Sequence, residues 1–305
     1  MRVRTYLVIV VVVGVVTAAL IVGPEYMMQN PITGPRTFNS QLPFRVYVRD
    51  REGEGDIQEV GETPAEEQLQ IPQCRWWVVA PREDLDWSAL ADEISEKQIP
   101  GLDAHHMTAD TDLAHLEGLN VLRELELRST KVTDEGLSHL KGLKNLQVLH
   151  LGRTEVTDRG LAPLKALPNL RELDLWGTAV TGEGLASLED LENLQELSLG
   201  ETEVTDGGLL FLRGLKNLRV LFLEGTGVTD AGLVHLEDLQ NLRVLDLEGT
   251  KITDEGLVHL EDLQNLRKLS VANTEVTDKA VRELMDDLPK LEVWHGEGSD
   301  SGLNR

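Results

Sequence analysis

One eight-residue block recurs through the second half of the chain at a constant interval of 24 residues. Its copies read TKVTDEGL from position 130, TEVTDRGL from 154, TAVTGEGL from 178, TEVTDGGL from 202, TGVTDAGL from 226, TKITDEGL from 250 and TEVTDKAV from 274. A fixed period of this length indicates stacked, equivalent coils, because one such unit buries its apolar side only against its neighbours. The sequence therefore predicts an elongated solenoid rather than a compact globule.

Each unit changes its hydrophobic period once, as the stretch that begins at Asn145 illustrates. Leu149 and Leu151 alternate with polar residues, which predicts a short strand with one buried face. From Thr157 onward the leucines fall three and four residues apart, which predicts a helix with Asp158 or Thr157 as its N-cap. Parallel strands stack about 4.8 Å apart and helices about 8–10 Å apart, so the stack should curve with its strands on the concave side.

The full pattern, L-x-x-L-x-L-x-x-T-x-V-T-D-x-G-L-x-x-L-x-x-L, resembles the leucine-rich-repeat family over residues 99–295. It is most similar to the strand-plus-helix class found in ribonuclease-inhibitor-like, F-box-associated and many bacterial exported proteins. The resemblance implies an α/β solenoid with a curved parallel sheet inside and helices outside. The family commonly has Asn or Cys where this chain has threonine, so a threonine ladder is expected in place of an asparagine ladder. These threonines are Thr130, Thr154, Thr178, Thr202, Thr226, Thr250 and Thr274.

Two further columns of the repeat carry structural expectations. Aspartate recurs just before each helix, and we interpret this column as helix N-caps. It comprises Asp134, Asp158, Asp206, Asp230, Asp254 and Asp278, and Gly182 interrupts it. Glycine recurs two residues after the aspartate, where it disfavours a helix by about 1 kcal/mol against alanine. We therefore expect a close approach of the neighbouring coil to require glycine at 136, 160, 184, 208, 232 and 256.

The N-terminal 22 residues differ in composition from the repeats. Residues 1–5 are basic, and residues 6–22 contain no charge. A helix over 6–22 would be roughly 26 Å long at about 1.5 Å per residue, close to the hydrocarbon thickness of a bilayer of about 30 Å. We interpret 6–22 as an uncleaved transmembrane signal anchor, with a cleaved signal peptide or a buried helix as alternatives. The basic end should stay cytoplasmic, which places the repeats on the extracytoplasmic side.

Residues 23–43 are rich in Pro, Gly, Asn and Gln and predict an extended linker. A capping segment at 44–98 follows, with predicted strands at 44–48 and 74–80 and a helix at 86–98 whose N-cap is Asp86. The acidic stretch 50–70 within it predicts a flexible loop. We expect the segment 74–98 to shield the N-terminal end of the stack, and residues 296–305 to form a flexible tail.

Composition excludes several classes of partner and site. The chain has 53 acidic and 29 basic residues and a formal net charge of -24. Such a surface repels phosphates and anionic lipid headgroups, so nucleic acid is disfavoured and a basic protein or peptide is favoured. The single cysteine, Cys74, excludes an internal disulfide and a four-cysteine zinc site. The sequence contains no nucleophile-elbow, metalloprotease, phosphate-loop or kinase motif, so we predict a non-enzyme without cofactor or metal.

Three strand columns should face the concavity, because they alternate with buried leucines. They begin at Glu124, Glu126 and Arg128 and repeat every 24 residues. They place scarce aromatic and valine side chains among carboxylates, which is how a protein interface is built. The candidate binding residues are Trp176, Phe222, Val220, Val244, Glu172, Asp174, Glu196, Glu224, Asp246 and Glu248.

The sequence thus predicts a membrane-anchored, non-enzymatic module that binds a protein or peptide, basic in character, on its concave face. Three alternatives stay open. One is a structural envelope spacer without a specific ligand. Another is an adaptor in protein turnover, which is implied only by the resemblance to F-box-associated repeats. The third is an enzyme, for which the segment 44–98 is the only basis.

Overall fold

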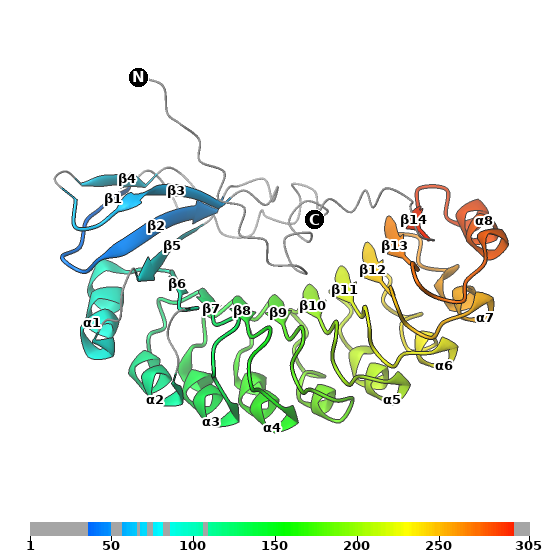
Figure 1. The fold of residues 1–305 in the computed structure, drawn as a ribbon, viewed down its shortest axis with the longest axis horizontal. Coiled ribbons are helices and arrows are strands. Elements are labelled where there is room, and N and C mark those ends of the chain that lie inside the picture. The colour runs from blue at the N-terminus through cyan, green and yellow to red at the C-terminus, as the bar shows by residue number, and fades with distance from the viewer. Residues whose placement is uncertain are drawn as a thin grey trace, which may run out of the picture.

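The structure is a computed structural model that describes residues 36–49, 57–65, 68–71, 76–81, 86–105 and 109–295. The chain winds through successive coils that form an arc, with strands along the inner side and helices along the outer side (Figure 1). The predicted α/β solenoid, curved with its sheet on the concave side, is therefore confirmed.

One sheet of twelve strands lines the arc, in the order β14-β13-β12-β11-β10-β9-β8-β7-β6-β5-β2-β3. From β5 to β14 every neighbouring pair is parallel, and in the repeats the partners lie 24 residues apart, as Val220 and Val244 do. The strands are β1 Arg36–Phe38, β2 Phe44–Arg49, β3 Ile57–Glu62, β4 Leu69–Ile71, β5 Trp76–Pro81, β6 Gly101–Asp103, β7 Glu124–Glu126, β8 Val148–His150, β9 Glu172–Asp174, β10 Glu196–Ser198, β11 Val220–Phe222, β12 Val244–Asp246, β13 Lys268–Ser270 and β14 Glu292–Trp294.

The helices of the repeats are short. Most coils contain a single α-helical turn that tightens into a 3₁₀ turn, and only the two ends carry longer helices, α1 and α8. The α-helices are α1 Trp87–Lys97, α2 Asp110–Leu113, α3 Asp134–Leu137, α4 Asp158–Leu161, α5 Asp206–Leu209, α6 Asp230–Leu233, α7 Asp254–Leu257 and α8 Asp278–Asp287. The 3₁₀ helices are η2 Ala114–Leu116, η3 Ser138–Gly142, η4 Ala162–Ala166, η5 Gly184–Ser187, η6 Leu210–Leu212 and η7 Val258–Leu260.

The N-terminal cap continues the sheet. Strand β5 pairs in parallel with β6 and antiparallel with β2, so the edge of the repeat sheet is covered. Helix α1 begins as predicted, with the Asp86 carboxylate accepting hydrogen bonds from the amides of Ser88 and Ala89. Its buried residues, Leu90 and Ile94, face the core.

The expected loop at 50–70 and linker at 23–43 differ from the structure. Strand β3 lies inside the expected loop, where it pairs antiparallel with β2. Strands β1 and β4 pair with each other in a separate two-stranded sheet. Low apolar content did not prevent β3 from forming, because backbone pairing with β2 supplies its hydrogen bonds. The rest of the predicted linker, 23–35, and the tail 296–305 lie outside the described residues.

Two hydrogen-bonded ladders connect the coils, and neither is the ladder that the sequence suggested. The aspartates of the repeat other than Asp278 accept hydrogen bonds from the backbone amide and the hydroxyl of a threonine in the next coil, as Asp230 does from Thr253 at 2.7 and 2.8 Å. The same pairing joins Asp110–Thr133, Asp134–Thr157, Asp158–Thr181, Asp206–Thr229 and Asp254–Thr277. The N-cap interpretation of this column is wrong, since the threonine preceding each of these aspartates holds the N-cap position.

An asparagine column makes the second ladder. Its amide groups donate to a backbone carbonyl 25 residues earlier, at 2.7–2.8 Å. The donors are Asn145, Asn169, Asn193, Asn217, Asn241 and Asn265. The threonine hydroxyls that we expected to form a ladder bond inside their own coil instead, as Thr130 does to the carbonyl of Leu127.

The glycine column confirms the predicted close approach. A Cβ atom at Gly160 would lie 2.5 Å from the Asp134 carboxylate of the preceding coil, and Gly136, Gly184, Gly232 and Gly256 face an aspartate in the same way. At Gly208 the preceding coil has Gly182 instead, and a Cβ would lie 2.5 Å from its Cα.

The predicted membrane span at 6–22 lies outside the described residues. Among the helices that the structure describes, none combines the length and the apolar character needed to cross a bilayer.

Candidate binding surface

The three predicted columns lie along the inner side of the arc, because they occupy equivalent positions of the strands β7–β13 or follow directly after them (Figure 1). Strand register places Glu196 beside Glu172 and Val220, and Asp174 beside His150 and Ser198. The geometry therefore brings the sequence-predicted residues together on one curved surface, which we call the concave surface.

The expectation that these columns face solvent is wrong for the apolar members. Phe222 is 3 % exposed, Val220 0 % and Val244 1 %. These side chains lie outside the main leucine core, and Val220 and Val244 are register partners, so each covers part of the other. On the inner side of a curved sheet, side chains from neighbouring strands converge. Trp176, Glu172, Glu224, Asp246 and Glu248 are partly exposed, whereas Asp174 and Glu196 are buried.

A protonated histidine bridges two strands of the concave surface. The ring nitrogens of buried His150 lie 2.7 Å from carboxylate oxygens of Glu126 and Glu172. Burial and the nearby Arg128 lower the pKa of His150, but the two carboxylates raise it to about 9. Burial alone would raise the pKa of Glu126, but His150 and Arg128 lower it to about 2. The cluster is therefore an ion pair at neutral pH.

Arg128 is the second cation of the cluster, and it pairs with Asp174 across Gly152, which has no side chain to separate them. A side chain at Gly152 would collide with the Asp174 carboxylate, which lies 2.6 Å from its Cβ position. Because the gap is open, Asp174 reaches Arg128 two coils away, at 2.6 Å from the guanidinium Nε. Arg128 also donates to Glu126 at 3.0 Å.

Gly200 leaves an equivalent gap two coils further along, but here no arginine stands at the position that Arg128 holds. The Glu224 carboxylate leans over Gly200 towards Trp176, which occupies the column position of Arg128. Trp176 carries the Arg153 guanidinium 4.5 Å above its ring. Oxygen Oε2 of Glu224 is buried and has no hydrogen-bond partner. Burial, and then the charge of Asp246, raises the pKa of Glu224 to about 8.

Glu196 lies between these two arrangements. Burial raises the pKa of Glu196 well above its usual value, and the neighbouring Glu172 raises it further. Burial and neighbouring carboxylates therefore favour the protonated forms of Glu196 and Glu224 in the middle of the concave surface.

Comparison with known proteins agrees with this architecture. The sequence profile described as "Leucine Rich repeat" matches residues 118–141, 142–165, 166–188 and 238–260. An internalin (inlF) from Listeria monocytogenes has a similar structure, with a TM-score of 0.51 and 19 % identity over 70 % of each chain. The chain has a leucine-rich-repeat fold.

A second solved structure of the same kind, internalin C2 from Listeria monocytogenes, is 27 % identical and aligns with a TM-score of 0.43 over 62 % of this chain and 84 % of that one. No curated protein matches the chain.

Three residues of this concave surface lie in the predicted columns but are not among the predicted binding residues. These are Glu126, Arg128 and His150, which form the ion-paired cluster. The available signal was the 24-residue period itself, which puts a cationic residue among carboxylates in neighbouring coils. Arg267, which directly precedes β13, donates hydrogen bonds to the backbone carbonyls of Gln264 and Leu266.

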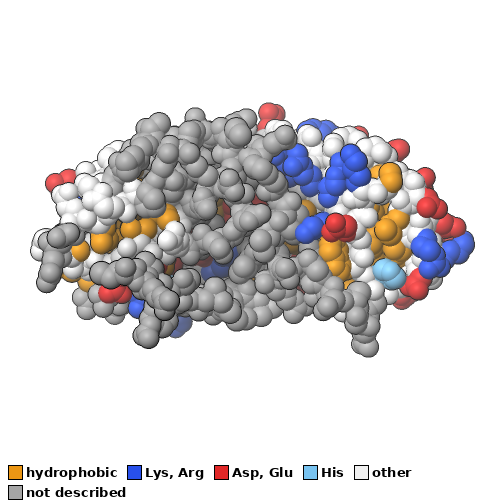
Figure 2. Space-filling view, turned by 90° about the horizontal axis from the view of Figure 1, so that it is seen from above, with side chains coloured by type: hydrophobic (Ala, Val, Ile, Leu, Met, Phe, Trp, Pro, Cys, Tyr) orange, Lys and Arg blue, Asp and Glu red, His pale blue; other side chains and the backbone are white. Residues whose placement is uncertain are grey.

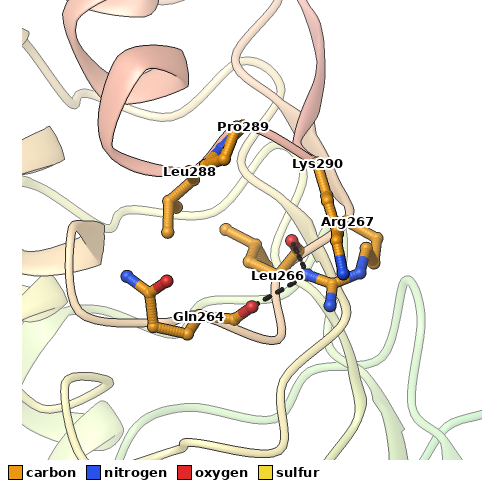
Figure 3. Close-up of a pocket in the computed structure, with 6 residues that line it drawn as sticks. All are labelled: Gln264, Leu266, Arg267, Leu288, Pro289 and Lys290. Carbon is orange, nitrogen blue, oxygen red and sulfur yellow. Dashed lines mark hydrogen bonds between the residues drawn. The ribbon is translucent and has the colours of Figure 1, made fainter.

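The same arginine lines a small pocket at the C-terminal end of the leucine-rich-repeat arc. The pocket has a volume of about 130 Å³ and lies beside Leu288, Pro289 and Lys290 (Figure 3). The end of the arc shows mixed basic, acidic and apolar side chains when viewed from above (Figure 2). So small a volume suits solvent better than a substrate.

Two histidines of the outer face contact carboxylates of the preceding coil. His139 lies 2.6 Å from Glu117, and His259 lies 2.6 Å from Glu237. Within the described ranges no group of three potential ligands could hold a metal ion. Cys74 lies outside those ranges.

Proposed function

We propose that the chain is a non-enzymatic protein-binding module that receives a basic segment of another protein on its concave surface. The leucine-rich-repeat fold supports this proposal because it presents a long, rigid, curved sheet, a shape suited to extended binding surfaces. The excess of carboxylates on that sheet favours a partner that carries Lys or Arg.

The main support for this proposal is oxygen Oε2 of Glu224, which has no hydrogen-bond partner. At the Gly152 gap the protein supplies its own cation, Arg128, to the leaning carboxylate of Asp174. At the Gly200 gap the corresponding position holds Trp176, and Oε2 of Glu224 is left buried without a partner. A buried polar atom that lacks a hydrogen bond costs about 1–3 kcal/mol. A guanidinium or ammonium group of a partner would remove that cost and could stack on the indole ring.

The ring of Trp176 and the acids Glu224 and Glu248 therefore form the proposed contact site, and Phe222, Val220 and Val244 form its packed floor. Binding of a cation would favour the ionised form of Glu224, so association should release protons at pH values below its pKa of about 8.

Panning a displayed library of random peptides against the full chain tests this function. We expect selected peptides to be enriched in Arg or Lys, and their affinity to fall about tenfold or more for a Trp176→Ala and Glu224→Gln double variant. Glu189→Gln, which removes one carboxylate on an exposed outer loop, is the charge-matched control and should bind normally. Selected peptides without basic enrichment would contradict the proposal, and a failure to select any peptide would favour the spacer.

We also propose that residues 6–22 anchor the protein in a membrane, with the repeats on the extracytoplasmic side. The support is the uncharged stretch itself and the basic residues Arg2 and Arg4 in front of it. An anchor of this kind would leave the concave surface free to meet a soluble or surface-bound partner.

A further inference from the structure

The large hydrophobic side chains that are exposed in the described part of the chain gather in one region. They are Leu210 at 47 %, Val234 at 39 %, Val258 at 59 % and Met285 at 40 %. All four lie on the outer, helical side of the last coils, in η6, directly after α6, in η7 and in α8. Hydrophobic residues scattered singly on a surface are ordinary, but a contiguous set is a mark of interaction.

Three of the four form a regular column, which we call the outer stripe. Leu210, Val234 and Val258 are 24 residues apart and therefore occupy the same position in three consecutive coils. Their equivalents in the earlier coils are small, namely Ser138, Ala162 and Ala186. The stripe does not serve the fold, because the buried leucines on either side of it already fill the core.

Carboxylates frame the outer stripe increasingly towards the C-terminus. The positions three and four residues before and after Val258 are Asp254, Glu255, Glu261 and Asp262, and such positions are neighbours on a helical surface. All four are exposed. Around Val234 the frame includes Glu237 and Asp238, while around Leu210 it contains only one carboxylate, Asp206.

The spacing of the stripe matches a helix that lies across the coils. Neighbouring helices pack about 8–10 Å apart, and seven residues of an α-helix advance about 10.5 Å. An amphipathic helix with an apolar residue at every seventh position could thus place one on each coil. A second copy of this chain fits less well, because two convex faces touch over a small area and both carry a net negative charge.

We propose that the outer stripe is a docking surface for a basic amphipathic helix of a protein partner, with apolar residues along one face and Lys or Arg on both flanks. It is separate from the concave surface, so both could be occupied at once. The exposed area is small, which suits a weak and reversible contact.

The test measures binding of a synthetic helical peptide to the full chain by fluorescence anisotropy. The probe has about 18 residues, roughly 27 Å as a helix, with leucine at every seventh position and lysine on the flanks. We expect it to bind, and a scrambled peptide of the same composition to bind at least about tenfold more weakly. A triple variant, Leu210→Asn with Val234→Thr and Val258→Thr, should lose binding to the same extent.

Two control variants show whether the peptide binds at the outer stripe itself. Ala162→Ser with Ala186→Ser alters the same column in earlier coils and should leave affinity unchanged, as should Trp176→Ala with Glu224→Gln on the concave surface. Thermal melting of the triple variant should equal that of the wild type, since the stripe residues are exposed. Equal affinity of wild type and triple variant would overturn the proposal. A concentration-dependent dimer in sedimentation that the triple variant abolishes would assign the stripe to a second copy instead.

Discussion

Gly207 and Gly208 are adjacent in α5, yet the structure predicts opposite effects of a methyl group at the two positions. A Cβ at Gly208 would lie 2.5 Å from the Cα of Gly182, which is backbone and cannot rotate away. At Gly207 nothing lies within 4 Å of the Cβ position. Gly208→Ala should therefore lower the free energy of unfolding by about 1–3 kcal/mol.

Gly207→Ala is its matched control and should be neutral or stabilising by up to about 1 kcal/mol, because alanine favours a helix over glycine. Urea denaturation of the two variants and the wild type measures the difference. Equal shifts for both variants would contradict the close approach of the two coils at Gly182.

His150 should make stability depend on pH above neutrality. Its pKa is raised to about 9 in the folded protein by Glu126 and Glu172, against about 6.5 in an unfolded chain. The raised pKa stabilises the fold fully below about pH 6.5, and this contribution is lost as the pH rises through about 9. The two pKa values correspond to a stabilisation of about 3 kcal/mol.

The measurement is the free energy of unfolding of wild type and His150→Gln between about pH 6 and 9.5. Their difference should be largest at the acidic end and shrink as the pH rises. Glu224 also titrates in this range, but it is present in both proteins and its effect cancels. A difference that does not change with pH would show that His150 acts as a neutral hydrogen-bonding group.

At the scale of the elements, the aspartate–threonine ladder should contribute to the coupling between coils. Asp230→Ala removes the partner of the Thr253 amide and hydroxyl, and we expect a loss of about 1–3 kcal/mol in the free energy of unfolding. Asp278→Ala is the control, because Asp278 has the same place in the repeat and makes no such ladder bond to any residue that the structure describes; its exposed contact is with His295.

The control loses only the favourable charge at the start of α8 and a surface ion pair, together about 1 kcal/mol. Chemical denaturation compares the variants. If Asp278→Ala proved as damaging as Asp230→Ala, the aspartate column would act within its own helix, as the N-cap interpretation of the sequence supposed.

The elements that the sequence predicted correctly are those whose signal is local. The alternation of Leu149 and Leu151 marks a strand, and Asp86 marks the start of α1, without knowledge of any neighbour. Strand β3 could not be predicted from its acidic composition, since its stability comes from pairing with β2. The role of the aspartate column depends on a threonine 23 residues further on, so only the stacking reveals it.

For the candidate site, the sequence likewise predicted which residues share a column but not which of them are buried. The 24-residue period placed Trp176 and Glu224 in one column, and the structure keeps them there. Exposure was not predictable, because the convergence of side chains inside the arc, which buries Phe222, depends on curvature. The gaps at Gly152 and Gly200 are visible as glycines in the sequence, but which carboxylate leans over each of them depends on side-chain geometry.

At the scale of the whole molecule, the first prediction concerns the N-terminus. If residues 6–22 are an uncleaved anchor, the mature protein still contains them. Intact-mass measurement of the protein extracted from membranes checks this. A chain that begins within or just after 6–22 would show a cleaved signal and a secreted protein.

The last prediction concerns the electric field of the molecule as a whole. With a formal net charge of -24, the chain should attract a basic ligand from a distance. Salt screens this attraction, because the Debye length falls from about 30 Å at 0.01 M to about 8 Å at 0.15 M. The association rate should therefore fall steeply as the salt concentration rises. The dissociation rate should depend instead on the contacts at Trp176 and Glu224, which salt screens much less.

Surface plasmon resonance with an Arg-containing peptide separates the two rates. Glu189→Gln with Glu192→Gln removes distant charge and should slow association slightly while leaving dissociation unchanged. Trp176→Ala with Glu224→Gln should mainly speed dissociation. If both pairs of substitutions changed only the association rate, the peptide would be held by the general field of the protein, and the Glu224 carboxylate at Gly200 would not be its binding site.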